Sequence, residues 1–522
     1  FNSNLKINNF EKYIKNNFHK SALLESKRFT DEIKFIDKIE YSLKSEIIAF
    51  LRFRFHSTIF LIELIECSIK DLNVKNIFVS GIVKNKHFLH NSKLSSEIVK
   101  NLYESICKTI IPIKKISSEE TRVFKYLVKK IPKSNNQKIL MSNGGYNFSK
   151  IASELKKINN IDCWIPSFEK ISIIRKIYFK LFKNINTITF TKDLEKEKKQ
   201  IEFTFPISFK YNQSKDLSYI LNLFRKKLNY YFNDLNQKIL ATKNLINLNN
   251  CFSFTLSNIT RGIDGAILDK DIPLPSMCVS HGTISKSINQ YDEIYRKIIA
   301  EGVFNGDSKY FSIQSKLMND SLVTHKIKGK KIITGNLVFA SNQSQNNKKK
   351  YFLYASTIKD FSNLHFLGVE MFYEYFKSLK DLDHIAEKLK ENIIVKVHPT
   401  VSPCTRMLKK IFKNLNFANT KIDNLLENAI ALISYSSSSI EDSLNSKVPV
   451  ILYDPFDRYR HIEEKKPKSE NESVHYSSSK NNLIKTMIAL KEKKIFNFDD
   501  YVYNISFDES IKEHIIPLIN QK

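Results

Sequence analysis

Residues 391 to 461 constrain the fold more than any other stretch, because three short apolar runs alternate there with loops and helical patterns. The runs are Ile393–Val397, Ala429–Ile433 and Val448–Tyr453. Apolar, β-branched runs of this length are typical of buried strands. Strands that alternate with helices predict a parallel sheet of the α/β class.

Polar loops follow the first two of these runs. His398-Pro399 ends the first, and the second opens into the serine run Ser436–Ser439. The serines precede a predicted helix at Ile440–Asn445, which carries Glu441 and Asp442 in its first turn. Hydroxyls and backbone N–H groups at a helix start suit a phosphate, and parallel strand ends share one crevice. A serine run alone is also a common helix cap, and a His-Pro pair alone is more often structural. Their joint occurrence at the ends of consecutive strands favours a binding site.

Length and composition indicate a globular protein of several domains. A chain of 522 residues is too long for one core and predicts two or three domains. The net charge of +29 comes from lysines spread along the whole chain, without an RNA-binding aromatic motif, zinc spacing or arginine-rich helix. We therefore expect no specific nucleic acid, and instead acidic substrates or the anionic surface of a membrane.

The cysteines and the most apolar segment bear on location. The six cysteines are scattered without metal spacing, which predicts reduced thiols in a cytoplasmic protein: Cys67, Cys107, Cys163, Cys251, Cys278 and Cys404. Residues Ile47–Ile69 carry several charges, including Arg52 and Glu63, so we expect an amphipathic or buried helix instead of a membrane span. No signal peptide is visible, and a cytoplasmic protein at the inner face of the membrane is expected.

Two further loops upstream have the same strand-end position. Ile139–Ser142 reads as a strand, followed by Asn143–Asn147 with a Gly-Gly pair and then a helix at Ser149–Lys157. Such a pair suits close backbone approach but lacks the dinucleotide fingerprint. Farther on, Val279–Thr283 places His281 before Gly282 after a short apolar run. This histidine is a candidate site residue, although a plain turn histidine would look the same.

Composition shifts divide the chain into four parts. We expect an N-terminal α/β or helical region at 1–135, α/β domains at 136–340 and 341–480, and a C-terminal helical segment at 481–522. The polar stretch Ser341–Lys350 is the clearest linker. After it, Tyr351–Ala355 predicts a strand with Ser356 and Thr357 at its end.

The order of these motifs resembles that of GT-B-fold transferases of bacterial surface polysaccharides. The motifs are His281-Gly282, Lys331–Asn336, Lys396–Pro399, Ser436–Ser439 and Pro449–Asp454. The pattern is most similar to the CDP-glycerol glycerophosphotransferases of teichoic acid synthesis, and capsule-type sialyl- and Kdo-transferases share the His-Pro and serine signature. The resemblance covers roughly residues 250 to 470. It implies a GT-B-like fold, with two Rossmann-like domains facing a cleft and an additional helix-rich N-terminal region.

The resemblance also implies roles for individual residues. His281 would be the general base on the acceptor hydroxyl, and His398 would bind or protonate the donor phosphate. The serine cluster would hold that phosphate, with Glu441 or Asp442 near the nucleotide ribose. The expected donor site comprises Gly282, Ser356, Thr357, Lys396, Pro399, Ser436, Ser437, Ser438, Ser439, Glu441, Asp442, Arg458 and Arg460. The long N-terminal region and Thr400 after His-Pro depart from the glycerophosphotransferase pattern and leave the donor open.

The chemistry of transfer agrees with these roles. A base must deprotonate the acceptor, and positive charge must compensate the leaving phosphate. Histidine has a suitable pKa for the first task, and the helix start after Ser439 with Arg458 and Arg460 suits the second. We expect no metal and no cofactor, because Asp269-Lys270-Asp271 and Asp381-Leu382-Asp383 are unconvincing metal pairs. The donor would be a CMP-, CDP- or UDP-linked sugar or polyol, and the acceptor a glycan or a lipid-linked molecule, with peripheral membrane association.

Two alternatives remain open at this level. A sugar-nucleotide 2-epimerase of the same fold would bind a UDP-sugar without any acceptor. A basic nucleic-acid-binding protein would show affinity that falls steeply with salt.

Overall fold

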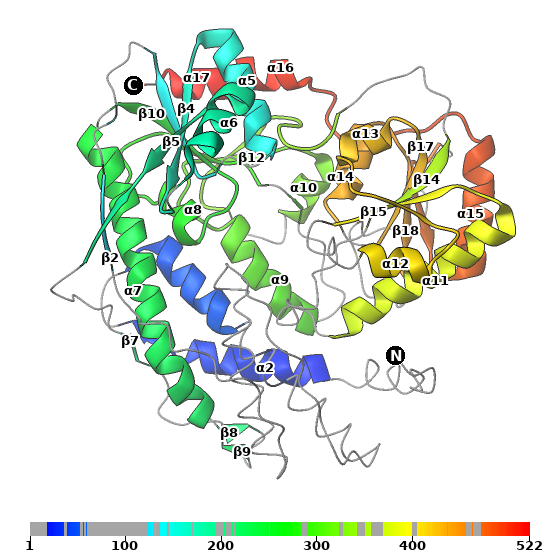
Figure 1. Ribbon diagram of the computed structural model, residues 1–522, viewed down its shortest axis with the longest axis horizontal. Coiled ribbons are helices and arrows are strands. Elements are labelled where there is room, and N and C mark those ends of the chain that lie inside the picture. Colours follow the sequence, from blue (N-terminus) through cyan, green and yellow to red (C-terminus); the bar gives the residue numbers. More distant parts are fainter. Residues whose placement is uncertain are drawn as a thin grey trace.

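The computed structural model describes residues 18–35, 39–52, 56, 59, 124–128, 131, 136–143, 146–169, 171–194, 203–204, 210–211, 215–216, 218–249, 251–280, 282–283, 290–322, 327–341, 350–355, 369–398, 405–435, 437–455, 462 and 471–521. Within them, two parallel sheets covered by helices lie side by side (Figure 1).

The first sheet has seven strands in the order β13-β12-β11-β10-β3-β4-β5. Their bounds are β3 Lys138–Met141, β4 Asp162–Ser167, β5 Ile185–Thr189, β10 Phe252–Ser257, β11 Ser276–Cys278, β12 Tyr310–Ile313 and β13 Lys330–Ile333. Every pairing is parallel. The chain builds outward from β3 to β5 and then returns to place β10 beside β3, which is doubly wound Rossmann-like topology.

The second sheet repeats this winding with six parallel strands in the order β16-β15-β14-β17-β18-β19. Their bounds are β14 Tyr351–Tyr354, β15 Ile393–Lys396, β16 Asn416–Ala418, β17 Ala429–Ser434, β18 Val450–Tyr453 and β19 Val474–Ser477. The α/β class and the two Rossmann-like sheets predicted from the sequence are confirmed. The strand order reverses between β3 and β10 in the first sheet and between β14 and β17 in the second.

Helices cover the sheets on both faces, which explains why the strands read as continuous apolar runs. Along β14, Phe352 and Tyr354 belong to one apolar cluster, while Tyr351 and Leu353 belong to the cluster on the opposite face. The helices that accompany the first sheet are α5 Tyr146–Asn159, α6 Ile173–Lys183, α7 Ser218–Asn249, α8 Gly262–Ala266, α9 Gln290–Val303 and α10 Lys316–Ser321. Those of the second are α11 Val369–Leu389, α12 Thr405–Ile411, α13 Ile422–Leu426, α14 Ser439–Asn445 and α15 Lys480–Glu492.

The C-terminal segment contributes to both domains. Leu483 and Met487 of α15 are buried in the core of the second sheet. The chain then returns through α16 Phe507–Glu509, a π-helical turn at Ser510–Ile515 and α17 Ile516–Ile519 to the first domain (Figure 1). Ile511 and Ile515 are fully buried in the core of the first sheet. The segment expected as one C-terminal unit at 481–522 is therefore shared.

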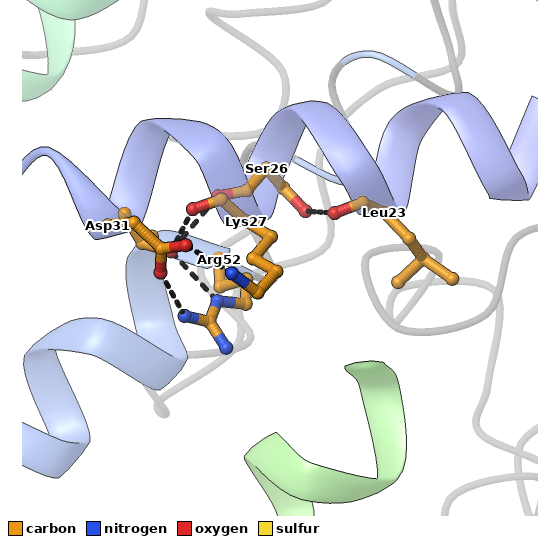
Figure 2. A network of polar contacts seen from close by, with 6 residues as sticks. Leu23, Ser26, Lys27, Asp31 and Arg52 are labelled. Atoms are coloured by element: carbon orange, nitrogen blue, oxygen red, sulfur yellow. Dashed lines mark hydrogen bonds and ion pairs between the residues drawn. The ribbon is translucent and has the colours of Figure 1, made fainter. Parts of the chain in front are cut away.

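The described part of the N-terminal region packs against the first domain. It contains α2 Phe18–Asp31, helical residues 41–52, β1 Lys34–Phe35 and β2 Phe124–Leu127. The strand β1 pairs with β7 Phe203–Thr204, and β2 pairs with β6 Thr191–Leu194, both antiparallel. A separate antiparallel pair, β8 Lys210–Tyr211 with β9 Lys215–Asp216, precedes α7. Arg52 joins the two helices. Its Nη2 lies 3.2 Å from Asp31 Oδ1 (Figure 2), and its Nε donates to Thr30 Oγ1 at 2.8 Å. The apolar run within Asn76–Ser80, which predicts a strand, lies outside the described residues.

The apolar segment that begins at Ile47 is buried where it is described. Ile47, Phe50 and Leu51 are fully buried on the helix that contacts the first domain. Among the described helices, none has the length and hydropathy that a membrane crossing requires.

Candidate functional site

The carboxyl edges of the two sheets meet, and residues of α14 hydrogen-bond to loops of the first domain. Thr283, which follows β11, donates from its hydroxyl to Glu441 Oε1, and Ser315, which follows β12, donates to the same oxygen at 2.7 Å. The backbone N–H of Ala340 donates to Asp442 Oδ1 at 2.8 Å. All the candidate loops described below lie on these edges, so the structure brings the loops of the two domains together.

Glu441 and Asp442 are therefore contacts between the domains. Burial raises the pKa of Glu441, although the two hydroxyl donors oppose the rise. Burial raises the pKa of Asp442 to about 7, against the opposing effect of the Ala340 N–H. Glu441 Oε2 is buried with no hydrogen-bond partner in the described part of the chain. A role for either carboxylate beside a nucleotide ribose stays a prediction, and protein donors already occupy one oxygen of each.

The serine run forms a tight turn before α14. Ser437 Oγ accepts from the backbone N–H of Ser439 at 3.2 Å, and Ser437 O accepts from the N–H of Ile440 at 3.1 Å. The first N–H groups of this short helix are thus bound within the turn. Ser438 is exposed, and a Cβ added to Gly282 of the first domain would lie 3.9 Å from its Cβ. The hydroxyls of this turn, which lies beside the loop at 282, therefore remain available to bind a ligand. Ser436 lies outside the described residues.

His398 lies at the same edge as the serine turn. It follows β15, and only β14 separates β15 from β17, which leads to the serines. Adjacent strands are about 4.8 Å apart, so the two strand ends are about 10 Å apart. Lys396 is half-buried, its ammonium donates to the carbonyl of Val397 at 2.9 Å, and burial lowers its pKa. The predicted neighbours Ser356, Thr357, Pro399, Arg458 and Arg460 lie outside the described residues.

His281 also lies outside the described residues, but both its neighbours are described. Ser280 Oγ donates to Gly282 O at 2.7 Å and accepts from the N–H of Gly282 at 3.3 Å. The buried side-chain amide of Gln314 donates to Ser280 O at 2.6 Å. The residues that flank position 281 are thus held by hydrogen bonds at the end of β11.

Sequence reasoning missed a polar cluster at the point where the first sheet reverses its strand order. Asn143, after β3, donates through Nδ2 to Asn258 Oδ1 at 3.0 Å, and Asn258 follows β10. The Asn143 side chain also hydrogen-bonds Asp264 in α8, and burial raises the pKa of Asp264 to about 7. The signal was present as two Ser-Asn pairs, Ser142-Asn143 and Ser257-Asn258, each at the end of a strand.

The two Asp-x-Asp pairs have protein partners. Asp269 accepts from Ser42 Oγ at 2.8 Å, and Asp271 lies 3.4 Å from the ammonium of Lys243. On α11, Asp381 accepts from Tyr453 Oη at 2.8 Å, and Asp383 accepts from the N–H of Asn414 at 2.9 Å. Within the described ranges, no group of three or more His, Cys, Asp or Glu side chains is placed to hold a metal ion.

Among known proteins, similarity to this chain is found only in comparisons with solved structures. No protein family matches the sequence, and no curated protein does. The UDP-GlcNAc 2-epimerase of Methanocaldococcus jannaschii is similar over 72% of this chain and 97% of its own, with 14% identity and a TM-score of 0.41. The wall teichoic acid polymerase TagF is similar over 74% and 88%, with 13% identity and a TM-score of 0.41. For TarM the coverage is 74% and 99%, the identity 10% and the TM-score 0.42.

Similarities this low do not assign a function, whereas the strand order of the chain itself defines its fold. Two doubly wound parallel sheets meet at their carboxyl edges, through residues of α14 and of the loops after β11, β12 and β13. This is the arrangement that the motifs of the sequence predict, and the chain has a GT-B-like fold.

Proposed function

We propose that this protein transfers a sugar or a polyol phosphate from a nucleotide-activated donor to a hydroxyl of a surface-polysaccharide or lipid-linked acceptor. One observation carries the proposal: the carboxyl edges of two Rossmann-like sheets are in contact. In open α/β sheets ligands bind at the carboxyl edge, where the strand order reverses. Two such edges in contact hold two ligands next to each other, which is what group transfer requires.

The second domain supplies the donor side. His398 and the hydroxyls of Ser437 and Ser438 lie at the carboxyl edge on either side of β14. Histidine and hydroxyl donors can hydrogen-bond phosphate oxygens and stabilise the charge that develops as the leaving group departs. Arg458 and Arg460 are proposed to add positive charge on the basis of the sequence.

The first domain supplies the acceptor side, with His281 as general base. Its loop adjoins Ser438 of the second domain through Gly282. Asp264 is a second ionisable group on this edge, and its pKa of about 7 also suits proton transfer near neutral pH. In the proposed step the acceptor oxygen loses its proton to the base and bonds to the transferred group. The bond from that group to the donor phosphate breaks, and the nucleotide leaves with the bonding electrons.

A nucleotide panel followed by a release assay tests this function. We expect one of CMP, CDP, UDP or GDP to raise the melting temperature in the concentration-dependent way that binding to the folded state produces. Release of that nucleotide from its activated sugar or polyol should then depend on an added glycan or lipid-linked acceptor. Conversion of a UDP-sugar to its epimer without acceptor would instead identify an epimerase and overturn the transferase proposal.

A further inference from the structure

Helix α6 exposes its apolar residues. It lies between β4 and β5 of the first domain, and Phe179 is its only buried residue. Six large apolar side chains are exposed, with fractions of 48 to 81%: Ile173, Ile174, Ile177, Tyr178, Leu181 and Phe182. A helix on the surface of a globular domain normally buries its apolar stripe. This one presents it outward.

The exposed residues form one continuous surface, here called the α6 ridge. Ile173, Ile177 and Leu181 are spaced four residues apart, as are Ile174, Tyr178 and Phe182, so two adjacent rows run along the helix. The rings of Tyr178 and Phe182 stack, with centroids 5.5 Å apart. Phe179 lies on the other side of the helix, between the rows and the sheet.

Cations border the α6 ridge, and the helix contains no acidic residue. Its charged side chains are Arg175, Lys176, Lys180 and Lys183. The cationic groups of Arg175 and Lys183 both lie 5.7 Å from the ring centroid of Phe179, on the protein side of the ridge. An apolar ridge with cations along its sides matches the interface of an anionic bilayer, where acyl chains lie beneath negative headgroups. Two copies of so positive a surface would repel each other.

The helix is already formed without any partner. The Ser172 hydroxyl caps its start by accepting from the N–H of Arg175, and Asn184 ends it in the left-handed conformation with φ 52°. Binding through the ridge would therefore cost little ordering of the backbone. In a βαβ unit the helix begins at the carboxyl edge, so the start of α6 lies on the edge that holds the candidate site.

We propose that α6 anchors the first domain to the surface of a membrane rich in anionic phospholipid. The ridge would insert among the acyl chains, and the four cations would pair with headgroup phosphates. The inference rests on the proposed function only for the acceptor, since a lipid-linked acceptor would meet the enzyme at this surface.

Vesicle co-sedimentation tests the anchor without donor or acceptor, so its result is independent of activity. We expect the protein to pellet with vesicles containing about one third phosphatidylglycerol, and to pellet far less with phosphatidylcholine alone or at high salt. The triple variant Ile174→Ser/Leu181→Ser/Phe182→Ser should bind at least about 100-fold more weakly, because three inserted side chains are lost. Lys176→Ser/Lys180→Ser should lower affinity roughly 30-fold at low salt.

A matched control is the triple variant Leu248→Ser/Ile488→Ser/Ile495→Ser, which replaces exposed apolar residues elsewhere. It should bind vesicles like the wild type, and all variants should keep the wild-type circular dichroism and melting temperature. The proposal is overturned if the wild type pellets with neither the phosphatidylglycerol-containing vesicles nor the phosphatidylcholine vesicles. It is also overturned if the α6 triple variant binds as well as the wild type. It is equally overturned if the ridge supports only a dimer that this variant dissociates, since a second copy would then cover it.

Discussion

At the scale of single residues, the contact between the domains depends on two carboxyl groups whose pKa is raised by burial. Asp442 has a pKa of about 7, mainly because of burial and secondarily because Asp423 and Glu441 are near. In an unfolded chain the same group titrates near about 3.9. The folded state therefore binds one more proton than the unfolded state across this window. Its stabilising effect is complete below about pH 4 and is lost as the pH rises through 7.

We predict that Asp442→Asn makes stability less sensitive to pH. The wild-type melting temperature should fall between pH 5 and 8, whereas the variant should fall less, because Asn cannot ionise and its oxygen still accepts from Ala340. Near pH 8 the gain should be on the order of 1 to 3 kcal/mol. Melting curves across this range measure the slope. Asp508→Asn, at an exposed position, is the charge-matched control. A variant slope equal to that of the wild type would show that Asp442 does not titrate in this window.

His281→Ala should lower turnover by about 10² to 10⁴ while leaving the melting temperature unchanged, which is the usual scale for a lost general base. Initial rates of nucleotide release measure it, with His384→Ala on the exposed side of α11 as the control. Normal turnover would remove His281 from the mechanism. In that case Asp264→Asn becomes the decisive variant, since Asp264 lies on the same edge and burial raises its pKa to about 7.

At the scale of elements, Gly335 lets the C-terminal segment dock beside β13. Its φ of 69° is in the left-handed region, and an added Cβ would lie 2.7 Å from Ile505 Cβ. Ser510 Oγ donates to Thr334 O at the same place. Gly335→Ala should therefore lower stability by about 2 to 4 kcal/mol, the sum of backbone strain and overpacking. Thermal unfolding measures this. Gly282→Ala, where a Cβ would meet only an ordinary 3.9 Å contact, should leave the melting temperature unchanged. Equal melting temperatures for both variants and the wild type would contradict this account of Gly335.

Catalysis should persist in excess EDTA. The reason lies in the two Asp-x-Asp elements, whose carboxylates are bound by Ser42, Lys243, Tyr453 and Asn414. Metal-dependent transferases commonly need such a pair to hold Mg²⁺ against the donor phosphates. Nucleotide release with chelator and with added Mg²⁺ provides the comparison. A complete loss of activity that Mg²⁺ restores would show that the reaction requires the ion.

The sequence predicted the strands well because their apolar runs are buried on both faces. The runs at 351–355, 393–397 and 429–433 correspond to β14, β15 and β17 within one or two residues. Helix α6 was not predicted, because its apolar residues face solvent and their spacing therefore does not indicate a buried face. The hydrogen bonds from Thr283 and Ser315 to Glu441 could not be predicted from the sequence either. Such contacts depend on how two separately formed domains dock, and no local periodicity records that.

At the scale of the whole molecule, the chain passes between the domains twice. It leaves the first domain after β13, builds the second sheet and α15, and comes back with α16 and α17 (Figure 1). Lys150 on α5 also lies 3.4 Å from Asp423 on α13, which adds an ion pair between the domains. Two covalent connections and these contacts restrict how far the domains can separate. Opening of the site is therefore expected as a limited hinge motion about the two crossings.

The return of the chain also has a consequence for biosynthesis. Ile511, Ile515 and Leu518 belong to the core of the first sheet, whose first strand begins at Lys138. The last residues of the first domain are therefore synthesised only after the entire second domain. At about 5 to 20 residues per second, the roughly 180 residues after β13 take about 10 to 40 s to make. During that interval the nascent first domain carries an open apolar groove, which makes it a natural client for chaperones while the second domain is still being translated.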